Sequence, residues 1–320
     1  MMTEYCVAFW NLENLFDEEN SPRRSEKLQR TIGRELSGWT PSVLARKVSQ
    51  LAAIIRKMNQ ERGPDLLGVC EVENRYVLEL LVEAIRIPSR EYSIAHFDTA
   101  DQRGIDVAFL YDSRLFRAAE QFSHYIVKRN ATRDLFQVNF HTVNDKFLIV
   151  IGNHWPSRTA GQYESEPYRI LAGETLAYFH ERIQSIYDKD VSVLALGDFN
   201  DEPHNRSLTD YALVERTQRK VTLAQVPKFL NLTWRIVGQG IGTHYYNNSP
   251  NVLDQFLASR GLLTGRSGLQ IVPSSVEVVR FPEMVSPGSY PKPLRFGRGA
   301  QTNENGFSDH FPIAVMIREN

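Results

Sequence analysis

A short apolar run at residues 191–196 leads directly into the sequence Gly197-Asp198-Phe199-Asn200. An apolar run that stops at glycine and continues with polar residues is typical of a buried strand that delivers a site at its C-terminal end. Residues two apart in an extended chain point the same way, so Asp198 and Asn200 would face one target together. A carboxylate beside a carboxamide suits phosphate chemistry with a hard divalent metal. Taken alone, the same residues could form an ordinary strand-end turn.

Polar residues also stand at or near the ends of several other apolar runs. Strand ends are the places where α/β scaffolds hold catalytic groups. The number of such ends exceeds what turn chemistry alone would give, so we treat them as one candidate site. These further residues are Asn11, Glu71, His154, Asp254, Asp309 and His310.

Length and charge limit the functions that the chain can have. It has 320 residues, with 37 basic and 38 acidic side chains and a formal net charge of −1. That length supplies enough material for a large packed core. Near-neutral charge gives no bulk signal for nucleic acid, so binding to a polyanion would need a local basic patch.

The N-terminal residues 1–10 lack the basic segment and long apolar core of a secretory signal. No apolar run approaches the length of a membrane span. We therefore expect a cytoplasmic protein without a membrane span, and nothing in the sequence predicts a protein partner. Cys6 and Cys70 lie in apolar runs without zinc-ligand spacing, so both are predicted to be buried free thiols.

Apolar residues at helical spacing predict three main helices. The first begins at Pro41 and stops before Gly63, with its basic residues, Lys47 among them, mostly away from the apolar face. The second covers residues 76–87. The third is long and carries its apolar face on Ala172, Leu176, Phe179, Ile183 and Ile186.

Short apolar or alternating runs predict strands between and after these helices. We interpret residues 21–39 as an irregular insertion and residues 264–306, which are rich in Gly, Pro and Ser, as loop. Strands with intervening helices, interrupted by antiparallel meanders, predict two packed sheets with helices outside, in one α/β (α+β) sandwich domain over residues 1–320. The predicted strands are 5–10, 65–69, 92–97, 105–111, 122–127, 135–142, 147–152, 191–196, 243–246, 252–258 and 312–317.

Six short motifs surround the candidate residues, in an order that runs nearly the whole length of the chain. They are Phe-Trp-Asn-Leu-Glu-Asn with Asn11, Cys-Glu-Val-Glu-Asn with Glu71, Asn-His-Trp-Pro-Ser with His154, Gly-Asp-Phe-Asn with Asp198, Leu-Asp-Gln with Asp254, and Ser-Asp-His-Phe-Pro with Asp309 and His310. Together they resemble the endonuclease/exonuclease/phosphatase superfamily, in its deoxyribonuclease-like bacterial branch. Each motif is weak alone, but the ordered set is specific.

The resemblance implies a four-layer α/β/β/α sandwich, with two mixed β-sheets flanked by helices, and metal-dependent attack of water on a phosphate ester. It implies that Mg²⁺ is the cofactor, with Mn²⁺ as a substitute. Glu71 and Asp309 would hold the metal, and Asn11 would complete the protein ligands. Because Mg²⁺ keeps several waters, so sparse a ligand set is expected.

The resemblance also assigns catalytic roles. Asp198 would accept the proton of the attacking water or orient it, while Asn200 would fix the geometry and touch the phosphate. His310 would contact the scissile phosphate, with Asp254 behind it, because a carboxylate behind a histidine fixes its tautomer and stabilises its charged form. His154 would hydrogen-bond the phosphate and help to protonate the leaving oxygen.

Substrate-binding roles fall on Asn11, Asn200 and Arg103, which matches a position where many members carry a phosphate-facing arginine. Some alternatives stay open. Glu73 would face the same side of a continuing strand as Glu71 and is its rival as metal ligand. Asp98 could orient His154.

Other residues near these motifs have no firm role. His96 and His244 are left unassigned, because a lone histidine is more often structural than catalytic. Tyr245, Tyr246 and the basic residues of 280–298 could line a substrate groove or a solvated loop.

The resemblance leaves the phosphate ester itself open. Inositol-polyphosphate phosphatases usually place an aromatic residue and an arginine after Gly-Asp-Phe-Asn, where this chain has Asp201-Glu202-Pro203. The His-Trp-Pro-Ser motif is closer to the deoxyribonuclease side, so we predict a nuclease that acts on DNA or RNA. The low net charge argues against DNA. The alternatives are a phosphatase or phosphodiesterase for a small or lipid-derived ester, and a catalytically silent binding module.

Overall fold

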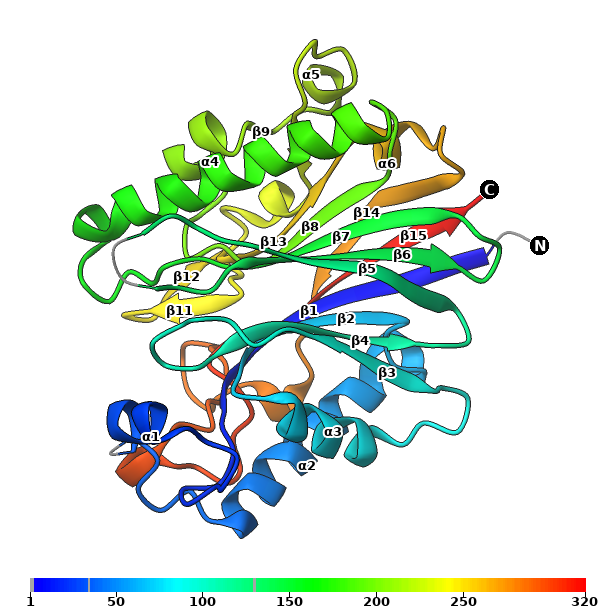
Figure 1. Cartoon of the computed structure of the whole chain (residues 1–320). Helices are drawn as coiled ribbons and strands as arrows, with labels where there is room; N and C mark the ends of the chain where they lie inside the picture. The colour runs from blue at the N-terminus through cyan, green and yellow to red at the C-terminus, as the bar shows by residue number, and fades with distance from the viewer. Residues whose placement is uncertain (1–2, 34, 129–130) are drawn as a thin grey trace.

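Two large β-sheets pack face to face at the centre of the molecule, and helices cover their outer faces (Figure 1). The computed structural model describes residues 3–33, 35–128 and 131–320. Reading through the molecule, the layers are helices, sheet, sheet and helices. This arrangement confirms the predicted four-layer α/β/β/α sandwich.

The first sheet has six strands in the order β14-β15-β1-β2-β4-β3. β1 and β2 run parallel, and the other neighbours are antiparallel. Its strands are β1 (Thr3–Leu15), β2 (Leu66–Val72), β3 (Tyr92–His96), β4 (Asp106–Asp112), β14 (Leu269–Val278) and β15 (Ile313–Glu319).

The second sheet has seven strands in the order β5-β6-β7-β8-β13-β10-β9, and β7 and β8 form a parallel pair. A small hairpin of β11 (His244–Tyr246) and β12 (Ser249–Asn251) stands apart from it. The strands of the second sheet are β5 (Phe116–His124), β6 (Leu135–Thr142), β7 (Phe147–His154), β8 (Val193–Asp198), β9 (Val214–Glu215), β10 (Phe229–Asn231) and β13 (Asp254–Ala258).

Helices α2 (Pro41–Glu61) and α3 (Arg75–Ile85) cover the six-stranded sheet, and α4 (Gln162–Ile186) crosses the seven-stranded one (Figure 1). The prediction for α2 is confirmed. Thr40 caps its N-terminus, and the backbone leaves helical geometry at Met58, shortly before Gly63. The shorter helices are α1 (Glu26–Ile32), α5 (Gln218–Thr222), α6 (Arg260–Thr264), η1 (Ser207–Tyr211), η2 (Thr233–Ile236), η3 (Pro282–Met284) and η4 (Gly299–Gln301).

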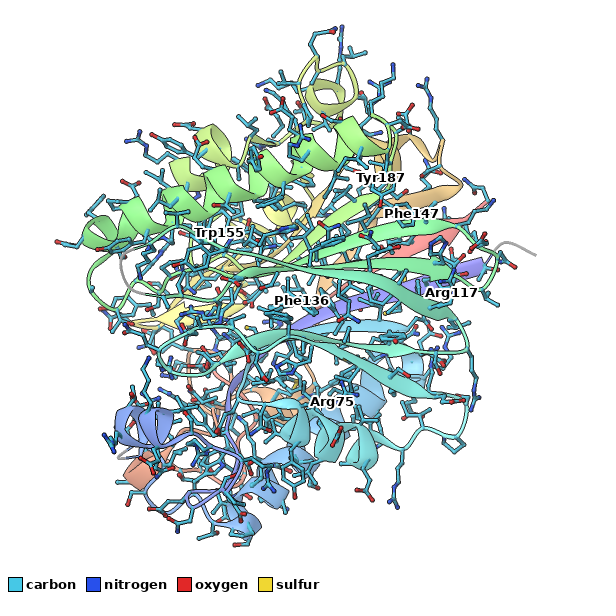
Figure 2. All side chains as sticks on the ribbon, viewed as in Figure 1. Arg75, Arg117, Phe136, Phe147, Trp155 and Tyr187 are labelled. Atoms are coloured by element: carbon cyan, nitrogen blue, oxygen red, sulfur yellow. The ribbon has the colours of Figure 1, made fainter. Side chains whose placement is uncertain are left out.

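The core follows the period-two alternation of the strands. In β1, Val7 and Phe9 join the apolar cluster between the sheets, while Ala8 and Trp10 join the cluster beneath α2 and α3. Figure 2 shows Phe136 between the two sheets, where its ring lies 5.7 Å from that of Phe109. Each large apolar side chain buried in this way contributes about 1.5–3 kcal/mol.

Several predictions of local structure are wrong. The segment 21–39, predicted to be irregular throughout, contains the short helix α1, which Ser25 caps through a hydrogen bond from Leu28 N–H to Oγ. The strand predicted at 122–127 is β5, which begins six residues earlier, at Phe116. The region predicted as loop at 264–306 contains β14, which pairs with the C-terminal strand.

Two side chains lie on the opposite face from the one predicted. Lys47 is fully buried in the core beneath α2, where its Nζ donates to the carbonyl of Phe307 at 2.6 Å. Ile186, at the end of α4, is 67% exposed. Cys6 and Cys70 are buried free thiols, as predicted. Within the described ranges, every helix is too short or too polar to cross a lipid bilayer.

Candidate active site

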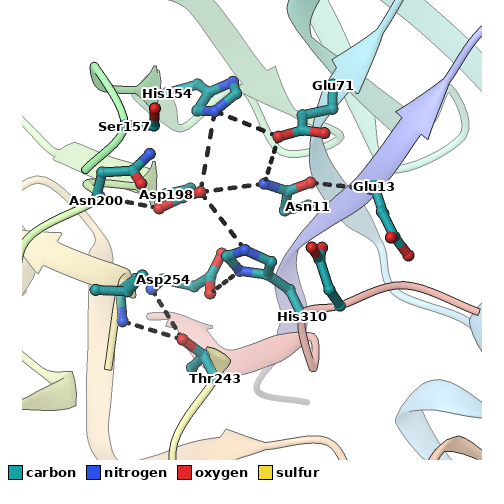
Figure 3. Close-up of polar contacts among 12 residues, drawn as sticks. Asn11, Glu13, Glu71, His154, Ser157, Asp198, Asn200, Thr243, Asp254 and His310 are labelled. Atoms are coloured by element: carbon teal, nitrogen blue, oxygen red, sulfur yellow. Dashed lines mark hydrogen bonds and ion pairs between the residues drawn. The ribbon is translucent and has the colours of Figure 1, made fainter. Parts of the chain in front are cut away.

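Six of the predicted residues come together where strands of both sheets end (Figure 3). Each sheet contributes residues from neighbouring strands, so pairing in the sheets fixes their relative positions. The six are Asn11 on β1, Glu71 on β2, His154 on β7, Asp198 on β8, Asp254 on β13 and His310 just before β15.

Strand register explains how three of these residues become neighbours. In the seven-stranded sheet, His154 pairs with Asp198, and Asp198 pairs with Asp254. Paired residues on adjacent strands lie side by side, so the three form a row across the sheet. The sequence pattern predicts each strand end, and the sheet order places the ends in one line.

Unusual backbone conformations turn the strand ends toward the site. Gly197 has φ +151°, and a Cβ there would lie 2.1 Å from the carbonyl oxygen of Asn153, so only glycine fits. Glu71 and Asn200 have φ 61° and 50°, a left-handed conformation that is uncommon outside glycine. The pairing of β2 shifts register between Cys70 and Val72, where Glu71 is the extra residue.

His310 lies between two carboxylates. Its Nδ1 is 2.7 Å from Oδ2 of Asp254, and its Nε2 is 3.8 Å from Oδ2 of Asp198. Burial alone would lower the pKa of His310, but the charges of these two carboxylates outweigh burial and raise it well above its ordinary value. The ring is therefore held as an imidazolium. Thr243 supports the pair, because its Oγ1 accepts the backbone N–H of Asp254 at 3.1 Å.

Asp198 is buried at the centre of the site. Its Oδ2 accepts a hydrogen bond from Nδ2 of Asn11 at 3.1 Å, and its Oδ1 accepts the backbone N–H of Asn200 at 2.9 Å. Burial raises the pKa of Asp198 to about 6, against the opposing effect of His310, and the charge of Asp254 adds to the rise. Asp198 can therefore take up a proton close to neutral pH.

The two asparagines of the site use their amides inside the protein. Nδ2 of Asn11 also approaches Oε1 of Glu71 at 3.3 Å, and its Oδ1 accepts the backbone N–H of Glu13. Asn11 thus donates hydrogen bonds to two carboxylates. To act as a metal ligand, it would have to present its Oδ1 instead. Nδ2 of Asn200 donates to the carbonyl of Trp155 at 3.0 Å, which fixes the loop after β8.

The structure separates the two rival glutamates. Oε1 of Glu71 lies 3.7 Å from Nε2 of His154, and its Oε2 accepts the backbone N–H of Asn14 at 2.9 Å. Glu73 instead forms a buried ion pair with Arg24, with both oxygens at 2.7 Å. Glu71 therefore belongs to the site, while Glu73 anchors the segment before α1.

Asp309 and Arg103 lie at the edge of this arrangement. The carboxylate of Asp309 is partly exposed, 3.7 Å from Nη2 of Arg295. Burial and the nearby charge of Glu71 raise the pKa of Asp309, against the opposing effect of His310. Arg103 contacts Oδ1 of Asn14, the residue whose backbone binds Glu71.

His154 lacks the orienting carboxylate that we considered for it. Asp98 is 82% exposed and lies beside His96, whose Nε2 is 3.2 Å from Asp106. The proposed contact between Asp98 and His154 is therefore wrong. Nδ1 of His154 is buried without a hydrogen-bond partner in the described part of the chain. Burial, with the charges of Arg133 and Arg103, lowers the pKa of His154 well below its ordinary value, so the ring is neutral.

Sequence reasoning missed some residues that support the site. Buried Glu13 accepts hydrogen bonds from the Arg295 side chain and from the backbone N–H of Phe296, which ties β1 to the loop before Asp309. The ring of His244 lies 4.8 Å from that of His310. Glu13 belongs to the same motif as Asn11, and this position in the motif is the sequence signal for its supporting role.

Comparisons with known proteins identify the family of this chain. The model of the Endonuclease/Exonuclease/phosphatase family matches residues 6–319 of the sequence. The chain belongs to this family. Among curated protein sequences, none matches this chain.

Solved structures similar to this one share its fold at low sequence identity. An endonuclease/exonuclease/phosphatase family protein from Bacteroides thetaiotaomicron has a TM-score of 0.58 at 13% identity, covering 100% of this chain and 99% of that one. A mannosyl-6-phosphatase from the same organism has a TM-score of 0.57 at 15% identity, covering 98% and 99%. The human Nocturnin catalytic domain with bound sulfate has a TM-score of 0.56 at 14% identity, covering 99% and 95%.

Proposed function

We propose that this chain is a metal-dependent phosphodiester hydrolase, and in particular a nuclease. The observation that carries the proposal is the surroundings of Asp198. This buried carboxylate has Nε2 of His310 at 3.8 Å and Nε2 of His154 at 4.0 Å, with Glu71 beyond His154. A base, an imidazolium and a second histidine around one point are groups that can carry out the hydrolysis of a phosphate ester.

Glu71 and Asp309 are the residues that would hold a divalent cation. Their side chains are 16% and 31% exposed, and Glu71 raises the pKa of Asp309, which means that their charges repel one another. Two hard oxygen donors that repel each other and are partly accessible to solvent fit Mg²⁺ or Mn²⁺. When bound, the cation supplies charge neutralisation at the phosphate oxygens.

Asp198 acts as the proton acceptor. A general base works best when its pKa lies near the working pH, and burial moves the pKa of Asp198 to about 6. The hydrogen bonds from Asn11 and from the backbone of Asn200 hold its two oxygens in fixed directions. Its orientation therefore does not depend on substrate.

The two histidines act differently because their charges differ. His310 is an imidazolium oriented by Asp254, so it stabilises negative charge that builds up on the phosphate. His154 is neutral, so it donates a hydrogen bond rather than a full proton until the substrate's own charge raises its pKa. Asn200 then contributes by holding the loop after β8 in place.

A phosphatase for a small phosphate ester is the second candidate. What favours it is that one structure with the same fold is a mannosyl-6-phosphatase. A catalytically silent binding module fits less well, since every acid, amide and histidine position of the motif set is filled. The nuclease and the phosphatase proposals both place the scissile phosphate beside Asp198 and His310.

One panel of substrates tests these proposals. Purified protein is freed of metal with EDTA and then assayed with Mg²⁺ or Mn²⁺ on plasmid DNA, single-stranded DNA, RNA, bis-p-nitrophenyl phosphate and mannose 6-phosphate. We expect activity only with added metal, and its loss in His310→Ala. His141→Ala is the matched control, because His141 lies on β6 beside Asp145, outside the site. Cleavage of no ester with either metal would refute the proposal, and activity without any polymer cut would refute the nuclease.

A further inference from the structure

We propose that Arg103 and Arg298 form a binding site for a second phosphate of the substrate, and that Glu35 competes for this site as an internal anion. The inference rests on the proposed function, because it places the second phosphate next to the scissile one. It adds a substrate class, since a substrate with a single phosphate would leave these two arginines unused.

The two arginines converge on one oxygen from distant parts of the chain. Nη2 of Arg103, in the loop between β3 and β4, lies 3.8 Å from Oε2 of Glu35. Nη1 of Arg298, just before η4, hydrogen-bonds the same oxygen. All three side chains are 33–38% exposed, so the group is open to solvent. Figure 1 shows α1, which leads into Glu35, beside the orange-red loop that carries Arg298.

Two guanidinium groups aimed at one oxyanion are an arrangement that also binds phosphate. Guanidinium groups match the geometry of carboxylates and phosphates equally, and a phosphate offers more charge and more acceptor oxygens than Glu35 does. Partly exposed ion pairs stabilise a protein little, so the contacts of Glu35 can exchange for a ligand at low cost. Within this group of three side chains, two positive charges face one negative charge.

This pair of arginines is linked to the candidate active site on two sides. Arg103 contacts Oδ1 of Asn14, and the backbone N–H of Asn14 binds Oε2 of Glu71 at 2.9 Å. On the other side, Arg295 lies three residues before Arg298 in the same loop and 3.7 Å from Asp309. A phosphate held by the pair would therefore be a neighbour of the one at the site.

The loop that carries Arg103 is fixed by packing rather than left free. Gly104 has φ +58°, and a Cβ there would lie 2.5 Å from Cδ2 of Leu28 on α1. Arg24 anchors the start of α1, because its side chain bonds both Gln29 on that helix and Glu73. The helix and the loop thus fix the position of Glu35 relative to Arg103, as a preformed anion site requires.

Such a site selects esters that carry a second phosphate near the first. A polynucleotide backbone and a small bisphosphate share this chemistry. The chain has a net charge of −1, so the positive charge here is a local feature and not a property of the whole surface.

Calorimetry tests the inference without requiring turnover. The wild-type protein with Mg²⁺ is titrated with thymidine 5′-phosphate and with thymidine 3′,5′-bisphosphate. We expect the bisphosphate to bind about tenfold more tightly, as one added charge-assisted contact implies. Arg298→Gln should reduce this preference to roughly twofold, and Glu35→Gln should widen it roughly threefold by removing the competing anion. A short oligothymidylate that displaces the bisphosphate would assign the second phosphate to a polynucleotide, and failure to displace it would assign a small bisphosphate.

Glu83→Gln is the matched control, because Glu83 pairs with Arg86 on the exposed side of α3 and should leave the preference unchanged. Equal affinity of the wild type for both nucleotides, or a full preference in Arg298→Gln, would overturn the inference. Failure of both nucleotides to bind would overturn it together with the binding of a scissile phosphate. Equal binding combined with hydrolysis of a model ester would leave the proposed function intact and reject only the second site.

Discussion

Nδ1 of His310 lies 2.7 Å from Oδ2 of Asp254, and this contact joins the C-terminal end of the chain to the strand that pairs with β8. The other ring nitrogen of His310 faces Asp198 at 3.8 Å. One imidazolium between two buried carboxylates is stable only because its charge balances theirs in part. The charge of Asp254 therefore helps to keep His310 protonated, and a change at Asp254 should act through His310.

Asp254→Asn should lower kcat by about 10²- to 10³-fold, the range for loss of a group that stabilises charge in the transition state. Asparagine keeps the shape but not the charge that holds His310 protonated. The measurement is steady-state hydrolysis of bis-p-nitrophenyl phosphate with Mg²⁺. Asp145→Asn, at an aspartate that is 82% exposed, is the control for the same change elsewhere. Activity of Asp254→Asn within twofold of wild type would show that the contact has no catalytic part.

Glu71→Gln and Glu73→Gln should have opposite effects. The first should raise the Mg²⁺ concentration for half-maximal activity by at least about tenfold, as expected when a metal site loses a partner. It should leave the free energy of unfolding unchanged or higher, because Glu71 repels Asp309. The second should lower stability by about 3–5 kcal/mol, because it leaves Arg24 buried and unpaired. The readouts are metal titration of activity and urea unfolding, and the reverse pattern would contradict the assignment of Glu71.

The sequence predicts most of the strand ends because two signals agree at each one. At Asp198, the apolar run predicts a buried strand and the polar motif predicts a site. The same holds at His154, where the strand reaches the histidine itself, two residues further than the pattern indicates. What no single strand reveals is that His154, Asp198 and Asp254 lie in one row, because that depends on pairing between distant segments.

The errors share a physical cause, which is that distant contacts override a local pattern. The sequence pattern predicts that Lys47 lies away from the core, because it is charged. In the structure its ammonium group donates a hydrogen bond to the Phe307 carbonyl and lies over the ring of Phe296. Burial lowers the pKa of Lys47 to about 8, which is a consequence of that fold and not of the helix sequence. Helix α1 has only seven residues and would be marginal alone, but Arg24 fixes its start.

Asp201→Asn should disturb the loop after β8 by removing an ion pair that holds this loop in the protein interior. Oδ2 of Asp201 lies 2.8 Å from Nε of the fully buried Arg169 and accepts the hydroxyl of Ser207 at 2.5 Å. Loss of its charge leaves Arg169 unpaired, so we expect a loss of about 3–5 kcal/mol in urea unfolding. Because Asn200 is the preceding residue, kcat should fall as well. Asp210→Asn, on the exposed side of η1, is the control, and equal stability of the two variants would exclude the role of the pair.

His180 offers a test of acid stability far from the site. Its ring lies on the buried face of α4, where it stacks on Phe229 with ring centres 3.8 Å apart. Burial lowers the pKa of His180 from its ordinary value of 6.5 to about 3. In the folded protein the ring therefore stays neutral down to acid pH, while in the unfolded chain it takes up a proton below about pH 6.5.

The unfolded state gains that proton as pH falls, so this histidine removes stability between pH 6.5 and pH 3, at about 1.4 kcal/mol for each pH unit. His180→Gln cannot take up the proton. We expect the fall in unfolding free energy from pH 7 to pH 5 to be smaller in this variant than in wild type by about 2 kcal/mol, whatever the cost of the substitution at pH 7. Urea unfolding at several pH values measures the difference. His204→Gln replaces a ring that is 54% exposed and should keep the wild-type slope. Parallel pH curves for His180→Gln and wild type would show that the buried ring does not stay neutral.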